Sequence, residues 1–583
     1  MPRFALPFAL LCLISAFLSP AATADEDPAV VGRFGPLIKT EVLPIHVVLL
    51  PTGKILYWDR HDQGTHDIIP RVWDPAANTT IKTPNPGYDL FCSGHSILRN
   101  GDVLIAGGHI VDGTGEDKMR IYNYKTNTWD AGIGPMNDGR WYPTNTTLPN
   151  GDVLITSGST ETDVGNEMPQ IYQYRTRTLR NLDSALLEVG LYPVMHVITY
   201  NKVFLAGPDS LTRFLDLRGR GKWIDVGFTN LRKVRSYGSS VLYAPGKIMI
   251  CGGAKFPPSA SVELIDANAA SPKWVYSDSM HYARRHHTAV MLPDGKVMVT
   301  GGTSGEGFNN ATGAVYASEM WDPATGHWTV MASAKSARLY HSFSLLLPDG
   351  RLLTGGGGHP GDDIDFLSEH PDFEIYEPPY LFRGTRPVID AAPDTLYYGQ
   401  SFHITTASVG DMHVTLLRLA AVTHALDMNA DFNRLPSQRE GTDDFIVAAP
   451  EDSVVSQPGP HMLFLLDSAG TPSVAKIVFL TSPHGPASIA ASGKSAVRYG
   501  FSVSGNRLRI AGLGKEAGTS CSLLTPQGGR VAELKRFSGG AGGIGETGGT
   551  DGDFRLPAQK LSGAYVVVVR TKSGKHTGKI FIP

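Results

Sequence analysis

The sequence predicts an all-β protein in which a β-propeller is followed by smaller β-domains, and two observations carry this prediction. The 583 residues include 65 glycines and 40 prolines but only 18% charged residues, a composition that favours many short strands joined by tight turns. One phrase also recurs until about Tyr380: a short apolar run, a turn with glycine or asparagine, and a second apolar run. The chain is too long for one ordinary core and indicates several domains.

The repeated phrase is evenly spaced. The turn residues of its seven copies are Gly53, Gly101, Gly151, Asn201, Gly246, Gly295 and Gly350. The successive gaps are 48, 50, 50, 45, 49 and 55 residues, and a period of about 50 is that of kelch-type propeller repeats. Each copy is typical of a β-hairpin, because apolar strands flank a glycine-containing turn. Residues 25–384 are therefore predicted to form a seven-bladed kelch-type β-propeller with four strands in each blade.

The repeat stops before Arg386-Pro387, where a different pattern begins. Strand-like runs at residues 412–419 and 461–466 predict an immunoglobulin-like β-sandwich over residues 385–483, of the kind that follows the propeller in galactose oxidase. Residues 484–583 are predicted to form a small β-domain that resembles those ending many exported bacterial proteins. Sorting or attachment to the cell surface is a role that we consider for it.

The first 24 residues have the pattern of a signal peptide. Arg3 precedes an apolar run over residues 4–18, and Ala22-Thr23-Ala24 fits a cleavage site. The apolar run is too short for a comfortable membrane span, so we expect cleavage before Asp25, no membrane anchor, and a secreted or cell-surface protein. The net charge of −3 provides no basic surface for nucleic acid.

Three cysteines remain after the predicted cleavage: Cys92, Cys251 and Cys521. They are too few for a disulfide-stabilised scaffold, and their odd number leaves at least one thiol to be explained separately. We expect Cys251 and Cys521 to be core residues. Two histidine pairs, His286-His287 and His61 with His66, are assigned to surface or packing roles because their repeats carry no partner residues for a metal.

Residues able to bind a metal lie at matching points of three repeats. Tyr340 and His341 come directly before the inner strand of the last repeat, where a phenol and an imidazole can reach one metal ion. Cys92 lies at the start of the second inner strand and Tyr142 at that of the third. Equivalent positions of a propeller lie at equivalent heights around the axis, so we expect these side chains to converge at one end of the channel.

With these residues in place, the sequence from about Val31 to Pro483 resembles the copper radical oxidases, the galactose oxidase and glyoxal oxidase family. The contexts Phe91-Cys92 and Arg140-Trp141-Tyr142-Pro143 are more similar to the glyoxal oxidase branch. In that family a cysteine and a tyrosine are joined by a thioether, and the modified tyrosine is both copper ligand and radical site. The matching residues here are Cys92 and Tyr142.

The resemblance implies the rest of the site. The family's second tyrosine and adjacent histidine match Tyr340 and His341, and its second histidine, from a loop of the sandwich domain, matches His424. One copper ion would then be held by Tyr142, Tyr340, His341 and His424, with the crosslink to Cys92 completing a radical cofactor. Imidazole and phenolate suit Cu(II). Tyr142, Tyr340 and Cys92 are the expected catalytic residues, with Tyr340 as general base.

The expected activity is oxidation of a small aldehyde or primary alcohol by O2, with release of H2O2, in a secreted monomer. Copper cycles by one electron, so the tyrosine radical would supply the second oxidising equivalent. The alternative is a non-catalytic kelch adhesion or carbohydrate-binding protein, which would not need all five site residues.

The sequence departs from the galactose oxidase branch in two respects. Only about 25 residues separate Ala24 from the first repeat, so the extra N-terminal sugar-binding domain is lacking. Residues 156–161 contain no tryptophan to stack over the crosslink. Phe256 and Trp274 are considered as substitutes, and galactose is disfavoured as the substrate.

Overall fold

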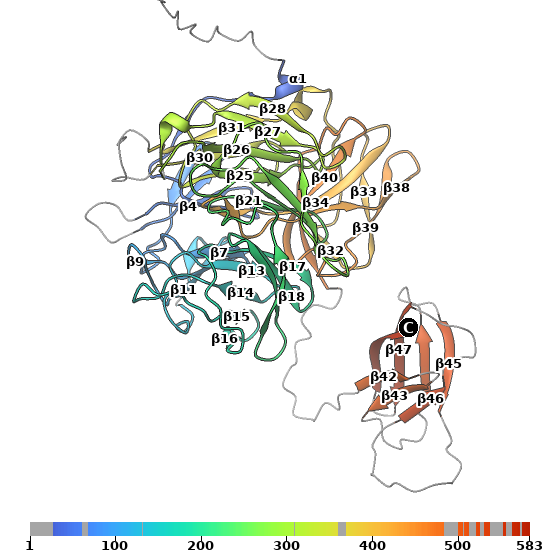
Figure 1. Cartoon of the computed structure of the whole chain (residues 1–583). Coiled ribbons are helices and arrows are strands. Elements are labelled where there is room, and N and C mark those ends of the chain that lie inside the picture. Colours follow the sequence, from blue (N-terminus) through green and yellow to red (C-terminus); the bar gives the residue numbers. More distant parts are fainter. Residues whose placement is uncertain are drawn as a thin grey trace, which may run out of the picture. The chain divides into compact units, whose positions relative to one another are not determined.

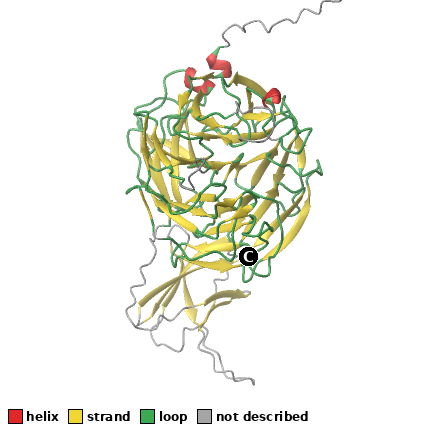
Figure 2. Cartoon of the chain, turned by 90° about the vertical axis from the view of Figure 1, so that its left-hand side faces the viewer, coloured by secondary structure: helices red, strands yellow, loops and turns green. Residues whose placement is uncertain are grey.

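The structure is a computed structural model that describes residues 27–60, 68–130, 132–307, 309–358 and 369–482, and the backbone of seven strands between 500 and 582. The predicted signal peptide and His61 with His66 lie outside these residues. Strands are the main secondary structure of the described chain, and the helices are short (Figure 2). The helices are α1 (Pro28–Val31) and the 3₁₀ turns η1 (Ala311–Gly313) and η2 (Pro379–Phe382). Among the described helices, none is long and apolar enough to cross a membrane.

Seven antiparallel sheets form the blades of a β-propeller, as predicted (Figure 1). Blade 1 contains β3 (His46–Leu49), β4 (Ile55–Trp58), β5 (Arg71–Asp74) and β6 (Thr79–Lys82). Blade 2 contains β7 (Gly94–Ile97), β8 (Val103–Ala106), β11 (Met119–Asn123) and β12 (Thr128–Trp129), with a hairpin of β9 (His109–Val111) and β10 (Thr114–Gly115) between them. Blade 3 contains β13 (Thr144–Thr147), β14 (Val153–Thr156), β15 (Gln170–Gln173) and β16 (Thr178–Asn181).

The next three blades also take their strands consecutively. Blade 4 contains β17 (Val194–Thr199), β18 (Lys202–Gly207), β19 (Leu211–Asp216) and β20 (Lys222–Phe228). Blade 5 contains β21 (Ser239–Ala244), β22 (Lys247–Cys251), β23 (Val262–Asp266) and β24 (Val275–Ser277). Blade 6 contains β25 (Arg285–Met291), β26 (Val297–Thr303), β27 (Ala317–Trp321) and β28 (Trp328–Ser333). In every blade the predicted turn residue lies between the first and second strands.

Blade 7 is completed by the beginning of the chain. It contains β29 (Ser342–Leu346), β30 (Leu352–Gly356) and β31 (Asp372–Glu377), and its outer edge is formed by β1 (Arg33–Phe34) and β2 (Ile38–Lys39), both paired with β31. Strand β29 also lies beside β3 of blade 1, which brings the last blade against the first. The N-terminal segment therefore closes the ring.

The core lies along the inner strands of the blades. Every residue of β3, β4, β25, β26, β29 and β30 is buried, whereas the outermost strand β6 is mostly exposed. Strands buried on both faces are expected to be continuously apolar, as the repeated runs are. Cys251 is fully buried within this core, which confirms its predicted role.

The segment after the propeller forms the predicted sandwich. One sheet contains β32 (Thr395–Tyr397), β41 (Lys476–Thr481), β40 (Gly459–Asp467), β34 (Met412–Arg418) and β37 (Phe432–Leu435), and the other contains β33 (Ser401–Thr405), β39 (Asp444–Ala448) and β38 (Ser437–Glu440). Two further strands, β35 (Ala421–Thr423) and β36 (Leu426–Asp427), leave the sandwich and extend blade 1, where Val422 pairs with Val47. The sandwich thus inserts a hairpin beside the innermost strand of the propeller.

The C-terminal part is a separate compact unit with one seven-stranded antiparallel sheet. Its order is β42 (Gly500–Ser504), β43 (Arg507–Ala511), β46 (Gly552–Arg555), β45 (Arg530–Arg536), β44 (Ser520–Leu524), β47 (Gly563–Thr571) and β48 (Gly574–Ile582). The end strands β42 and β48 lie against each other, so the sheet curls towards closure. The side chain of Cys521 lies outside the described part, and its predicted core role remains a prediction.

Candidate metal centre

Six blades place a residue with left-handed backbone at the start of their innermost strand or just before it. Their φ angles are Cys92 58°, Tyr142 64°, Tyr192 46°, Tyr237 54°, His286 63° and His341 73°. Non-glycine residues seldom adopt this conformation, and those that do gather at functional sites. We call these six residues the entry ring. The backbone thus turns the same point of each blade towards one end of the channel.

Backbone hydrogen bonds join the entry ring from blade to blade. The amide of Tyr142 donates to the carbonyl of Cys92 at 2.8 Å, and the amide of Tyr192 donates to the carbonyl of Tyr142 at 2.8 Å. On the other side, the amide of His286 donates to the carbonyl of Tyr237 at 2.9 Å. These contacts fix the relative heights of the entry residues of blades 2 to 4 and of those of blades 5 and 6.

The inserted hairpin supplies a seventh residue. His424 and Ala425 form the two-residue turn between β35 and β36, with φ angles of 49° and 70°. Positive φ at both positions is the requirement of a type I′ turn, whose twist matches the strands that it joins. Because β35 pairs with β3, this turn holds His424 at the same end of the channel as the entry ring.

The four predicted metal ligands lie together there. The hydroxyl groups of Tyr142 and Tyr340 form a short hydrogen bond. The ring of His424 lies 4.6 Å from that of His341 and 4.7 Å from that of Tyr142, centre to centre, and Tyr340 stacks on His341 at 3.8 Å. All four side chains are buried, with at most 6% of any residue exposed. The structure therefore brings together residues separated by up to 282 positions, from 142 to 424.

Hydrogen bonds select one nitrogen on each histidine. Nδ1 of His341 lies 2.9 Å from the carbonyl oxygen of Gly358, which only accepts, so this nitrogen carries the proton. Nδ1 of His424 lies 2.6 Å from the hydroxyl of Thr423, which itself donates to the carbonyl of Ile45. That hydroxyl must then accept the proton of Nδ1 from His424. In both rings the lone pair is on Nε2, the arrangement expected of a metal-binding histidine.

The two phenols are poised to ionise only with help from a cation. Burial raises the pKa of Tyr142 and of Tyr340 well above the ordinary value. A metal ion next to a buried acid favours its ionised form and so reverses this effect. Two neutral imidazoles and two phenols that a cation would deprotonate form a donor set that suits Cu(II).

Cys92 lies beside Tyr142 and forms no disulfide. Burial raises the pKa of its thiol well above the ordinary value, and a hydrogen bond with the Tyr142 side chain opposes this. The amide of Cys92 donates to Nε2 of His46 at 3.0 Å, and His46 stacks flat on Trp58 with 4.9 Å between ring centres. Blade 1 thus holds the backbone of the cysteine, although it contributes no residue to the entry ring.

Two aromatic rings enclose Tyr142, and neither was predicted. Trp141 stacks on it at 3.9 Å with an angle of 16° between the planes, and Tyr192 at 4.5 Å with 22°. Phe256 and Trp274, which we considered for this role, lie elsewhere: Phe256 is 53% exposed, and Trp274 packs in another core cluster. That suggestion was wrong because a residue next to Tyr142 already covers the ring.

Two further residues that the sequence analysis missed lie beside Tyr340. Tyr237 contacts it edge-on, with ring centres 5.5 Å apart, and His286 does so at 5.2 Å. Burial raises the pKa of Tyr237 to about 12 and lowers that of His286 well below its ordinary value. Of the two roles predicted for His286, surface or packing, the structure shows packing, since the residue is only 3% exposed. The signal for its place beside Tyr340 was its position, since it stands at the start of an inner strand.

Buried arginines support the entry ring from behind. They are Arg140, Arg235, Arg284 and Arg338, each of which donates to a carbonyl at the end of its blade's second strand. In blades 5, 6 and 7 the arginine forms an ion pair with a glutamate of the third strand: Glu263, Glu319 and Glu374. In blade 3, Arg140 donates a hydrogen bond to the side chain of Gln170 instead. Burial lowers the pKa of Arg140 to about 9. These side chains clamp the strand entries, and Arg235 also lines a pocket over the metal centre.

A pocket of about 300 Å³ opens over the metal centre and contains Tyr142 and His424 in its lining. Its apolar walls come from the start of β17 and the loop before it, the loop after β18, the loop before β21, and the hairpin: Leu191, Val194, Pro208, Val234 and Leu426. Tyr192 and Tyr237 add aromatic surface, and Asp209 is the one carboxylate among the described lining residues. The guanidinium of Arg235, which also lines the pocket, is paired with Glu263. Small, largely apolar pockets with a few polar groups are typical ligand sites.

Comparison with known proteins identifies the family of both domains. Residues 61–380 match the glyoxal oxidase N-terminus family, and residues 386–480 match the galactose oxidase-like early set domain. A galactose oxidase of Gibberella zeae is 28% identical over 520 residues, covering 82% of this chain and 74% of that protein. The aldehyde oxidase GLOX of Vitis pseudoreticulata is 27% identical over 517 residues, covering 79% and 96%.

A solved structure shares the fold. A fungal alcohol oxidase of the AA5 family, in complex with copper, superposes with a TM-score of 0.70 at 25% identity, covering 77% of this chain and all of that one. The first family match alone spans more than half of the 583 residues. This chain therefore belongs to the glyoxal oxidase family of copper radical oxidases.

Proposed function

We propose that Tyr142, Tyr340, His341 and His424 bind one copper ion, and that Cys92 becomes joined to Tyr142 by a thioether. At this centre a primary alcohol or a hydrated aldehyde is oxidised, and O2 is reduced to H2O2. One observation carries the proposal: two imidazoles with their lone pairs on Nε2 and two phenols lie within one buried cluster, with a thiol beside one phenol.

The residues divide the work of the reaction. Bound copper supplies a one-electron acceptor, and Tyr142, enclosed by Trp141 and Tyr192, supplies the second oxidising equivalent. Tyr340 accepts the proton of the substrate hydroxyl. The substrate loses two hydrogens, as an alcohol becomes an aldehyde or a hydrated aldehyde becomes an acid. Both hydrogens leave on H2O2, so atoms and electrons balance.

The pocket supports a compact substrate with an apolar body. Leu191, Val194 and Val234 offer methyl groups where a sugar would need partners for its hydroxyls. A buried hydroxyl without a hydrogen-bond partner costs about 1–3 kcal/mol. Aliphatic or aromatic alcohols and aldehydes are therefore favoured over galactose.

Action outside the cell is part of the proposal. The signal-like pattern of residues 1–24 supports export, and the C-terminal unit of β42–β48 is a candidate attachment module. We expect the oxidase unit to act as a monomer. Its five site residues all come from one chain.

Mass spectrometry and a peroxide assay test the proposal together. Copper and oxygen are added to the copper-free protein, and the peptides containing Cys92 and Tyr142 should be recovered joined, with the loss of two hydrogens. Peroxide release is then screened across aliphatic alcohols, aromatic alcohols, aldehydes and galactose. Cys92→Ser is the matched control, which should bind copper yet show no joined peptide and little peroxide. A free Cys92 thiol in active parent protein would refute the crosslink. Absence of peroxide release with every compound in the screen would refute the oxidase activity.

A further inference from the structure

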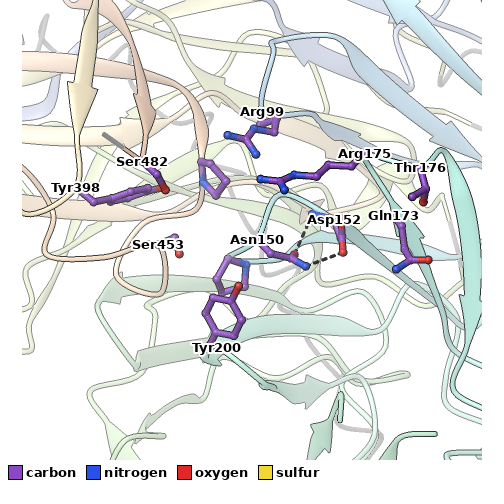
Figure 3. A pocket seen from close by; sticks show the side chains of 12 residues that line it. Arg99, Asn150, Asp152, Gln173, Arg175, Thr176, Tyr200, Tyr398, Ser453 and Ser482 are labelled. Atoms are coloured by element: carbon purple, nitrogen blue, oxygen red, sulfur yellow. Dashed lines mark hydrogen bonds between the residues drawn. The ribbon is translucent and has the colours of Figure 1, made fainter. Parts of the chain in front are cut away.

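A second pocket lies at the opposite end of the inner strands. It has a volume of about 480 Å³ and lies between the hairpin turns of blades 2 to 4 and loops of the sandwich (Figure 3). Arg99 and Arg175 line it from the propeller, and Tyr398 and Ser453 line it from the sandwich. Its volume is within the range of roughly 300–1,000 Å³ found for small-molecule sites. None of its residues belongs to the metal centre.

Two guanidinium groups face the same space. Figure 3 shows Arg99 and Arg175 directed towards one another inside the pocket. Arg99 donates to the hydroxyl of Thr481 at 3.3 Å. Within the described part of the chain, neither arginine forms an ion pair with a carboxylate. Like charges turned towards one space repel each other, and an anion between them would convert this repulsion into attraction.

The carboxylate in the pocket is already engaged. Asp152 accepts from the side-chain amide of Asn150 at 2.6 Å and from the backbone amide of Tyr174 at 3.0 Å, which holds the hairpin turn (Figure 3). Two arginines and one aspartate leave the lining with a net charge of +1. The pocket is therefore suited to an anion.

A neighbouring arginine shows the contrast. Arg177, two residues after Arg175, forms an ion pair with Asp130 in the adjoining groove between blades 2 and 3. This surface therefore neutralises one of its arginines with its own carboxylate but does not do so for Arg99 and Arg175. Arg177 also provides a control, because its removal deletes the same charge nearby without touching the pocket lined by Arg99 and Arg175.

The remaining lining is suited to a sugar. Tyr200, at the turn between β17 and β18, is 55% exposed at the rim, and the Tyr398 ring is held by a hydrogen bond from its hydroxyl to the carbonyl of Ser456 at 2.9 Å. Flat aromatic faces cover the apolar side of a ring, while Gln173, Thr176 and Ser453 offer hydrogen bonds to hydroxyls. A guanidinium group can bind a carboxylate through two parallel hydrogen bonds.

We propose that this pocket binds an acidic oligosaccharide, with a uronate carboxylate between Arg99 and Arg175. The site anchors the oxidase on an acidic glycan while the metal centre at the other end of the propeller remains open. This inference is independent of the copper chemistry.

Calorimetry on the full-length, copper-loaded protein tests the proposal. The probes are a short oligogalacturonate, the same oligomer with its carboxylates methyl-esterified, and inorganic sulfate. The oligogalacturonate should bind, and the ester should not. The double variant Arg99→Ala, Arg175→Ala should weaken binding by roughly tenfold or more, whereas Arg177→Ala should leave it unchanged. Peroxide production should be the same in all three proteins.

Three results would overturn the proposal. Equal affinity of the parent and the double variant would mean that the pocket is not the site. A comparable loss in Arg177→Ala would mean that general surface charge attracts the oligomer. If sulfate binds as tightly as the oligogalacturonate, the pocket is a simple anion site and the sugar assignment fails.

Discussion

His341 and His424 reach the metal centre by different routes. His341 belongs to the entry ring, whose members follow from the repeat, and is held by the carbonyl of Gly358 in its own blade. His424 comes from another domain on a hairpin paired with β3, and is held by the side chain of Thr423. The comparison teaches that a repeat can supply most of a site, while blade 1, which adds nothing to the ring, receives its residue by insertion.

Removal of either imidazole should have the largest effect. His341→Ala and His424→Ala should each reduce copper affinity by well over the roughly 100-fold that loss of a supporting partner costs. Copper content after dialysis and the Cu(II) spectrum measure the loss. If His424→Ala binds copper and turns over like the parent, the inserted hairpin does not complete the site. The contrast drawn between His341 and His424 would then be wrong.

Tyr340→Phe should retain copper but lose turnover. Two imidazoles and Tyr142 remain as ligands, whereas the proton acceptor for the substrate is removed, which costs about 10²–10⁴-fold. Steady-state peroxide release and bound copper are measured on the same preparation. Tyr237→Phe, which keeps a ring beside Tyr340, is the matched control and should lose less. Full activity in Tyr340→Phe would assign proton transfer to another group.

Thr423→Val should expose the weakness of the inserted ligand. Valine keeps the shape of threonine but removes the hydroxyl that orients His424, so copper affinity should fall by about 10–100-fold. Thr423→Ser keeps the hydroxyl and should bind copper like the parent. The backbone support of His341 has no such vulnerable side chain. Equal affinities in the valine and serine variants would show that β-pairing alone positions His424.

Two buried histidines, one in the propeller and one in the sandwich, should each lower the stability of the folded protein in acid. Burial lowers the pKa of His196 in blade 4 to about 4 and that of His461 in the sandwich to about 3. Below the unfolded-state value of about 6.5, the unfolded chain binds protons that the folded chain does not. Each group therefore removes about 1.4 kcal/mol of stability per pH unit as the pH falls from about 6.5 towards 4, and has no effect above that window.

Urea unfolding of the copper-free protein at pH 7.5, 6 and 5 measures this loss. His196→Gln and His461→Gln should each flatten the pH dependence. Burial also raises the pKa of Asp431 to about 6, which favours the folded state on acidification. The difference in unfolding free energy between variant and parent, taken at each pH, gives the contribution of the histidine. A variant with the parent's full pH dependence would show that this histidine is protonated in the folded state.

The sequence alone was enough for the architecture, because a 50-residue period and glycine turns are local signals. It also led to Cys92, Tyr142, Tyr340, His341 and His424, which the structure brings together. It did not lead to Tyr192, although Tyr192-Pro193 repeats Tyr142-Pro143 fifty positions later. Residues such as His46 and Trp141 were missed because their roles depend on which rings stack across blades, and no spacing along the chain encodes that contact.

The order of the residues along the chain determines when the site can be completed during synthesis. The outer edge of blade 7 is made by β1 and β2, and His424 lies 332 residues after Cys92. At synthesis rates of about 5–20 residues per second, the last ligand is made roughly 15–65 s after the cysteine. The copper site that we propose cannot be complete on a partial chain, so peroxide production at this site has to wait until the whole oxidase unit has been made.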